Sequence, residues 1–487
     1  MTQATDLTPR PAGRLLRLAL VGLVLAHLAL KLALLPRAVD APLQGDEVAY
    51  LDAAKALSNL VRDLVGLGPL DRTELADNVV GNGWFMPGMA VVMTPLLLVD
   101  PDPGLTVVRV YLGLVTLALY ALSLRAVDRT FGRPWTLVLL VVPGLVPMWL
   151  LYSFTAWGDA SAGLVTVLLV CQVTEAGRAL VDGRALGGRR AVTIGVLGAA
   201  VLYLRSSALP LVLGMLVLLV LGAVFLANRG TRPRSTASAV VACLAFATLV
   251  APWSLAASAT LDGRVLTTST VPISTAVSFG DVDELCFGPC GEGNIWYASV
   301  GYSQTVSRAT GVGELEVQQQ MSERALRDAT PSGIASDVLD NLDRYALQPA
   351  GFEPAFREVP GSAPDAVSRA ITLPTEILYF AVLLAAGAAL LLVPRRSRHL
   401  QLSGLVLKLG VLALFTQPFL HIGSARYWPV YLPLTALLVT WAWCVLRGAE
   451  PEPGSPAPRR WLAGAHVAVG LGVLGLAVTL GVLGGTT

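Results

Sequence analysis

The sequence predicts an all-α polytopic membrane protein with about 11 transmembrane helices and two large external loops, the second forming a small mixed α/β cap. Of its 487 residues 54% are hydrophobic and only 14% are charged, and the mean hydropathy is +0.65. Apolar runs recur along the chain, and a helix of about 20 apolar residues crosses a bilayer core of about 30 Å. Because lipid offers no hydrogen-bond partners, every backbone N–H and C=O must be paired internally, which favours a helical bundle.

Eleven apolar runs are predicted to span the membrane, of which the fifth is short. They cover residues 14–36, 105–124, 135–152, 160–178, 191–204, 209–227, 237–260, 373–394, 402–420, 428–446 and 461–484. The first run is longer than the apolar core of a signal peptide and lacks a small-residue cleavage site. We therefore expect it to stay in the protein as the first span.

The distribution of charge predicts the orientation. Nineteen of the 35 Lys and Arg residues precede the first span or lie in the turns that follow even-numbered spans. Residues 38–103 carry ten Asp and Glu against three Lys and Arg, and residues 261–370 carry fifteen against seven. The positive-inside rule then places the N-terminus in the cytoplasm, and both loops and the C-terminus outside the plasma membrane. Since the basic residues anchor cytoplasmic turns, the net charge of +2 gives no reason to expect a nucleic-acid partner.

Seven segments follow from this topology. In the first loop, apolar residues from Val48 to Val61 recur at helical spacing and predict helices lying on the membrane surface. The second loop begins with a β-like run rich in Thr, Ser and Val at 265–277 and ends in a helical stretch near 314–346. The segments are 1–37 (cytoplasmic N-terminus and first span), 38–103 (external loop 1), 104–260 (spans 2–7), 261–370 (external cap), 371–446 (spans 8–10), 447–460 (cytoplasmic Pro-rich linker) and 461–487 (last span).

Three acidic residues are candidates for catalysis. Asp46 and Glu47, in GDEVAYLDAAKAL, follow the first span, where a carboxylate can act as general base toward an attacking hydroxyl. Acids are also common in wet loops, and the spacing alone leaves that alternative open. Asp159 lies in a short external turn, in YSFTAWGDASAG. An acid at that depth lines a polar cavity, finds a partner, or caps the helix that follows.

Two arginines break the charge rule. Arg205, in VLYLRSSALPL, and Arg426, in HIGSARYWPVYLP, lie in external turns, and His421 is close to Arg426 in the chain. A guanidinium on this side indicates an anionic partner such as a lipid phosphate, although arginines also extend toward lipid headgroups.

Two cysteines of the CFGPC segment, Cys286 and Cys290, lie in the second external loop. An oxidising compartment favours a disulfide between them. Zinc is less favoured because no second Cys/His pair accompanies them.

Six segments, in chain order, resemble motifs of the GT-C superfamily of polytopic glycosyltransferases. The similarity is to the branch that uses polyprenyl-phosphate sugars, which includes protein O-mannosyltransferases and aminoarabinose transferases. The usual proline after the arginine is Ser206 here, and Ala256 and Ala257 stand where Arg-Asn is usual. The segments are GDEVAYLDAAKAL, WFMPGMAVVMTPL, VVRVYLGLVTLALYALSLRAVDRTFG, YLRSSALPL, APWSLAAS and ARYWPVYLPL.

The resemblance implies transfer of a sugar, such as mannose or arabinose, from a polyprenyl-phosphate donor to a hydroxyl of a glycan, lipid or protein during cell-envelope assembly. Asp46 matches the catalytic acid of the family, Glu47 is its neighbour, and Asp159 matches a second acidic position. Arg205, Arg426 and His421 are the residues expected to bind the donor phosphate. Two arginines can neutralise one lipid phosphate, so no cofactor is required. A divalent cation held by Asp46 and Asp159 is the alternative.

A polytopic lipid or sugar transporter or flippase is the main rival hypothesis, and a scaffold of envelope assembly is a second. A transporter predicts inverted repeats, and broken helices with buried charges at the bilayer midplane. The intramembrane cations include Lys31, Arg109 and Lys408. The candidate site residues lie instead at one membrane face, which favours an enzyme.

Overall fold

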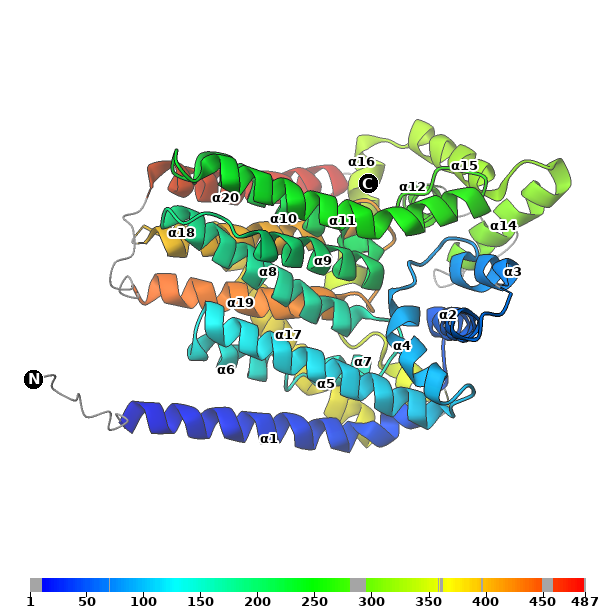
Figure 1. Cartoon of the computed structure of the whole chain (residues 1–487), viewed down its shortest axis with the longest axis horizontal. Coiled ribbons are helices and arrows are strands. Elements are labelled where there is room, and N and C mark those ends of the chain that lie inside the picture. The colour runs from blue at the N-terminus through cyan, green and yellow to red at the C-terminus, as the bar shows by residue number, and fades with distance from the viewer. Residues whose placement is uncertain are drawn as a thin grey trace, which may run out of the picture.

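The computed structural model describes residues 11–485 except 70, 281–294, 358, 360–361, 396 and 449–458. Within these ranges the chain is helical and contains no strand. Long helices lie side by side in one bundle, and most of the shorter ones gather at a single end of it (Figure 1).

The long helices form the body of the bundle. They are α1 (Pro11–Asp40), α5 (Leu105–Thr130), α8 (Asp159–Val181), α9 (Gly188–Leu204), α10 (Leu209–Phe225), α11 (Arg232–Thr260), α17 (Ala366–Leu391), α18 (Arg398–Leu414), α19 (Trp428–Leu446) and α20 (Arg460–Gly484).

The shorter elements connect and cover them. They are α2 (Asp46–Gly66), α3 (Arg72–Glu74), η1 (Leu75–Val80), α4 (Gly88–Val99), α6 (Arg133–Val141), α7 (Pro147–Tyr152), η2 (Ser206–Ala208), α12 (Thr270–Phe279), α14 (Ile295–Thr310), α15 (Glu314–Asp328), α16 (Pro331–Ala346), η3 (Glu353–Phe356) and η4 (Gln417–Phe419).

Nine helical segments in the described part of the chain are long and apolar enough to cross a membrane. The chain is therefore an all-helical multi-pass membrane protein, as the sequence predicts. The segments are Leu15–Asp40, Leu105–Thr130, Asp159–Val181, Ser206–Phe225, Arg232–Thr260, Ala366–Leu391, Arg398–Phe419, Trp428–Leu446 and Arg460–Gly484.

Two of the eleven predicted spans are not among these nine. Predicted span 135–152 is broken into α6 and α7, because Pro143 has no backbone N–H and biases Val142 away from helical geometry. Predicted span 191–204 is α9, whose 17 residues extend only about 26 Å at 1.5 Å per residue. Eleven uninterrupted spans are therefore not confirmed.

The mixed α/β character predicted for the second loop is also not confirmed. The β-like run at 265–277 becomes helical at Thr270, where α12 begins. Ile273, Ala276 and Val277 are buried, and their i, i+3, i+4 spacing explains why burial favours a helix over the β-propensity of the run. The helical stretch predicted near 314–346 is confirmed by α15 and α16.

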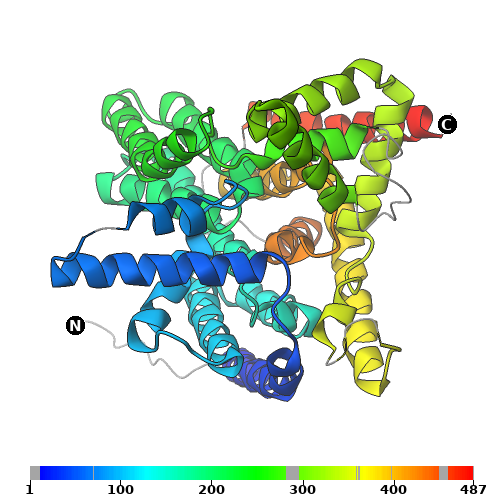
Figure 2. The same ribbon diagram turned by 90° about the vertical axis from the view of Figure 1, so that its right-hand side faces the viewer.

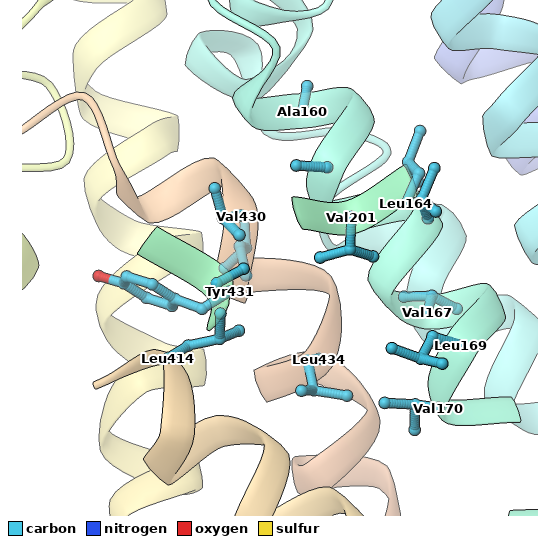
Figure 3. Packing of buried hydrophobic residues seen from close by; sticks show 14 of the residues in the cluster. Ala160, Leu164, Val167, Leu169, Val170, Val201, Leu414, Val430, Tyr431 and Leu434 are labelled. Atoms are coloured by element: carbon cyan, nitrogen blue, oxygen red, sulfur yellow. The ribbon is translucent and has the colours of Figure 1, made fainter. Parts of the chain in front are cut away.

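The core lies around α8 and α19, which pack against each other. Figure 3 shows both helices with side chains from the same buried cluster, among them Val167 and Leu434. Gly163 allows their close approach, because a Cβ at this position would lie 2.7 Å from the carbonyl oxygen of Pro429. This contact sets the start of α19 beside the start of α8.

Helix α2 lies across one end of the bundle, as Figure 2 shows when that end is viewed directly. This confirms a helix in the first loop, but its buried side differs from the predicted apolar stripe. Val48 is exposed, whereas Glu47 and Tyr50 are buried. The helix is therefore oriented by a buried acid.

Candidate functional site

A cavity of about 1050 Å³ opens beneath α2 at this end of the bundle. Four of the predicted site residues line it, namely Asp46, Arg205, Arg426 and His421. They come from the start of α2, the end of α9 and the segment between η4 and α19. Asp159 lies directly behind the two arginines, while Glu47 faces away from the cavity. The structure thus brings five of the six predicted residues together.

Asp46 forms an ion pair with Arg426 across 380 positions of sequence. The Asp46 side chain retains 22% exposure and the Arg426 side chain 13%, so both are reachable from the cavity. Asp46 occupies the first turn of α2, where the helix dipole stabilises a negative charge. The ion pair directs Asp46 toward the arginines.

Asp159 is fully buried and lies between the two arginines. Its Oδ1 is 3.2 Å from Nε of Arg205, and its Oδ2 is 4.0 Å from Nε of Arg426. Neither carboxylate oxygen has a hydrogen bond of good geometry, so the contact is electrostatic. Asp159 is not the helix cap considered above, because the N-cap of α8 is Gly158, in left-handed geometry with φ 80°. It holds both guanidinium groups at the cavity floor.

Aromatic side chains fix the positions of these guanidinium groups. Arg205 lies 4.0 Å and Arg426 5.3 Å from the ring centroid of Tyr427. Arg426 is also 5.6 Å from the ring of Trp157. Cations are attracted to aromatic faces at such distances. Neither Tyr427 nor Trp157 was predicted from the sequence. Both are aromatic and lie within two positions of a predicted site residue, and that proximity is the signal that could have identified them.

Glu47 has a different role from its neighbour Asp46. It is 1% exposed, and Arg109 of α5 donates to both of its oxygens. The backbone N–H of Ala156 donates to the same carboxylate at 2.9 Å, and that of Gln44 at 3.2 Å. With its oxygens occupied, Glu47 anchors the start of α2 to α5 and to the segment before α8.

His421 faces the cavity as a neutral side chain. Burial lowers the pKa of His421 to about 4, and the charges of Arg205 and Arg426 act in the same direction. The hydrogen bond to the backbone of Ile422 raises the pKa but does not outweigh them. Its Nδ1 lies 3.0 Å from the carbonyl oxygen of Ile422 and must carry the proton to donate there. Nε2 is then a hydrogen-bond acceptor, which suits a hydroxyl group better than a phosphate.

The remaining site predictions concern metals and the disulfide. Over the residues that the structure describes, no group of three or more His, Cys, Asp or Glu side chains is placed to hold a metal ion. Cys286 and Cys290 lie outside the described residues.

Comparison of the chain with family models, curated proteins and solved structures finds no match.

Proposed function

We propose that this protein is a membrane glycosyltransferase that moves a sugar from a polyprenyl-phosphate donor to an acceptor hydroxyl. One observation carries the proposal: Asp46 meets Arg205 and Arg426 in a single cavity at the end of a membrane-spanning bundle. The group combines a reachable carboxylate with two fixed cations. These are the parts that removal of a hydroxyl proton and departure of a lipid phosphate require.

The arginines are the proposed site for the donor phosphate. Guanidinium groups bind phosphate through paired N–H donors and remain charged when partly buried. Asp159 offsets about one of their two charges and lies too deep to meet the substrate. Asp46 offsets the other charge in the empty site, so a phosphate of one negative charge replaces Asp46 as the partner of Arg426. In this proposal the sugar phosphate occupies the cavity while the prenyl chain remains in lipid.

The reaction is a one-step displacement with inversion at the anomeric carbon. The acceptor oxygen forms a bond to that carbon, the bond from the carbon to the phosphate oxygen breaks, and the acceptor proton moves to Asp46. As Asp46 becomes neutral, its negative charge reappears on the departing phosphate. Arg426, paired with Asp46 in the empty site, transfers its interaction to the phosphate. The total charge of the site is unchanged throughout.

The arginine-rich end of the bundle is proposed to face the cytoplasm and the cavity to face the exterior of the plasma membrane. Asp159 at the start of α8 lies in the site, and Arg178 lies near the other end of the same helix. Arg205, at the end of α9, contacts Asp159, so α9 runs back along α8. If α9 and the broken α6–α7 segment both cross the bilayer, the chain makes eleven crossings.

The buried cations of the bundle give no support to the transporter hypothesis. Lys408 donates to the carbonyl oxygens of Leu390 at 2.7 Å and Leu392 at 2.6 Å, at the end of α17. Lys31 donates to Ser153, and Arg109 to Glu47. Each of these cations ties helices together, whereas a transport path needs charges that meet the substrate.

The test uses the full-length protein purified in lipid nanodiscs. Native mass spectrometry should detect a copurifying polyprenyl phosphate or its glycosylated form. Addition of candidate polyprenyl-phosphate sugars should then release free polyprenyl phosphate when an acceptor is present. A protein that binds neither lipid would contradict the proposal. Movement of the intact lipid across a vesicle membrane, without cleavage of the sugar–phosphate bond, would favour a flippase.

A further inference from the structure

The cavity is lined by a second set of residues besides the acids and arginines. Six of the rings that line the cavity contact one another in sequence, and we call them the aromatic arc. The arc consists of Tyr50, Phe85, Trp84, Trp296, His421 and Tyr427.

Ring contacts connect the whole arc. Successive centroid distances are 5.3 Å for Tyr50–Phe85, 6.3 Å for Phe85–Trp84 and 5.9 Å for Trp84–Trp296. They continue at 6.0 Å for Trp296–His421 and 6.2 Å for His421–Tyr427. Pairs at these distances support each other's orientation. The arc is therefore an ordered wall.

Both ends of the arc meet the proposed catalytic group. Tyr50 lies one helical turn beyond Asp46 on α2, and Tyr427 contacts Arg205 and Arg426. A molecule lying along the arc consequently has one end next to Asp46. This is the place from which an acceptor hydroxyl would approach.

Neutral polar groups complement the rings. Asn78, Asn82 and Thr267 line the cavity, and within the described part of the chain no hydrogen bond occupies their side chains. Thr270 lies beside them, with its hydroxyl 3.0 Å from that of Thr268. Nε2 of His421 adds an acceptor, since its Nδ1 is used by Ile422. Amides, hydroxyls and an imidazole nitrogen can all form hydrogen bonds with the hydroxyl groups of a ligand.

We propose that the aromatic arc, with Asn82 and His421, is the binding site for a carbohydrate acceptor. This inference depends on the proposed glycosyltransferase function. Sugars present C–H faces that stack on aromatic rings and hydroxyl edges that bond to amides, which is the composition of this wall. A fully apolar lipid acceptor would leave the amides unpaired at a cost. A Ser/Thr-rich peptide acceptor would offer the ring faces less continuous C–H surface than a sugar ring does.

The test measures saccharide binding to the full-length protein in nanodiscs by saturation-transfer difference NMR. The probes are methyl trisaccharides of mannose, arabinofuranose, glucose and galactose, with an uncharged Ser/Thr-rich peptide of similar mass for comparison. Trp296→Ala and Asn82→Ala should weaken binding of the preferred trisaccharide by roughly five- to tenfold. Trp296→Phe retains a ring and should preserve most of it. Trp443→Ala is the control, because Trp443 is exposed near the far end of α19 and should have no effect.

Binding of polyprenyl phosphate is measured on the same samples, so that the two proposals can fail separately. The Trp296→Ala, Trp296→Phe and Asn82→Ala proteins should bind this lipid as the unaltered protein does. Trisaccharide binding that is absent, or equal in all variants, would overturn the acceptor site even if lipid binding is intact. Binding of the peptide alone would overturn the carbohydrate assignment. Lipid binding that is absent from the unaltered protein would contradict the proposed function instead.

Discussion

Arg109 and Glu47 join α5 to the first turn of α2, and this buried pair sets the direction of the neighbouring Asp46. Glu47 points into the bundle and pairs with the guanidinium of Arg109. Asp46, the residue before it on the helix, therefore points into the cavity. Two adjacent acids therefore divide two tasks between them. One holds the helix in place and the other is available for chemistry.

The first prediction tests this division. Removing one member of a buried ion pair costs about 3–5 kcal/mol, because it leaves the other charge uncompensated. Arg109→Gln should therefore lower the thermal midpoint of the protein in detergent markedly. Glu47→Gln combined with Arg109→Gln should recover part of the loss. Equal destabilisation by Arg109→Gln and by the exposed control Arg72→Gln would show that the pair does not anchor α2.

Asp46→Asn keeps the shape of the side chain and removes the proposed base. We expect the transfer rate to fall by about 10²–10⁴-fold. Polyprenyl phosphate should bind at least as tightly as before, because Arg426 no longer has Asp46 as a competing anion. Asp63→Asn, on the same helix but outside the cavity, is the matched control and should leave the rate unchanged. Transfer at the normal rate by Asp46→Asn would move the base to another residue.

Arg205→Ala and Arg426→Ala should weaken binding of polyprenyl phosphate. A hydrogen bond to a charged group contributes about 1.5–3 kcal/mol, which corresponds to roughly 10- to 150-fold in affinity. Lysine at either position should restore only part of it, since an ammonium lacks the planar pair of donors. Affinity can be measured by native mass spectrometry with lipid titration. Arginine variants that bind the lipid normally would exclude these residues from the phosphate site.

His421 should affect stability through pH. Its pKa in the folded protein is about 4, below the ordinary histidine value, so the unfolded chain takes up a proton first on acidification. Stability attributable to this residue is complete above about pH 6.5 and is lost as pH falls toward 4. Between pH 7 and pH 5, His421→Gln should therefore show a smaller fall in thermal midpoint than the unaltered protein. The same fall in both would show that His421 is not held neutral.

Orientation and the predicted disulfide can be tested together. On intact cells, a membrane-impermeant maleimide should label Cys286 and Cys290 only after reduction, while Cys171 is buried. Cys286→Ser leaves Cys290 unpaired and should be labelled without reductant. Labelling of both cysteines without reductant would exclude the disulfide. Labelling only after the cells are opened would place this loop, and the cavity with it, on the cytoplasmic side.

The composition predicted the helical membrane bundle. Charged residues at unexpected positions along the chain identified part of the site. Arg205 and Arg426 were recognised because they break the charge rule, and Asp46 because it follows a span. Their partners were not predictable. The contacts of Asp46 with Arg426 and of Glu47 with Arg109 depend on how distant helices pack, which no local pattern encodes. The broken α6–α7 segment shows the same limit, since its apolar composition is that of an unbroken span.

The positions of Asp46, Asp159, Arg205 and Arg426 along the chain also bear on its synthesis. Ribosomes add residues in order, so the three earlier members are made long before Arg426, 380 positions after Asp46. Until α19 inserts beside α8, Asp46 lacks its cation and Asp159 has only Arg205. Products that end before residue 426 should consequently be inactive and good substrates for membrane quality control. Supplying the missing C-terminal helices as a separate chain is a direct way to restore the charge balance.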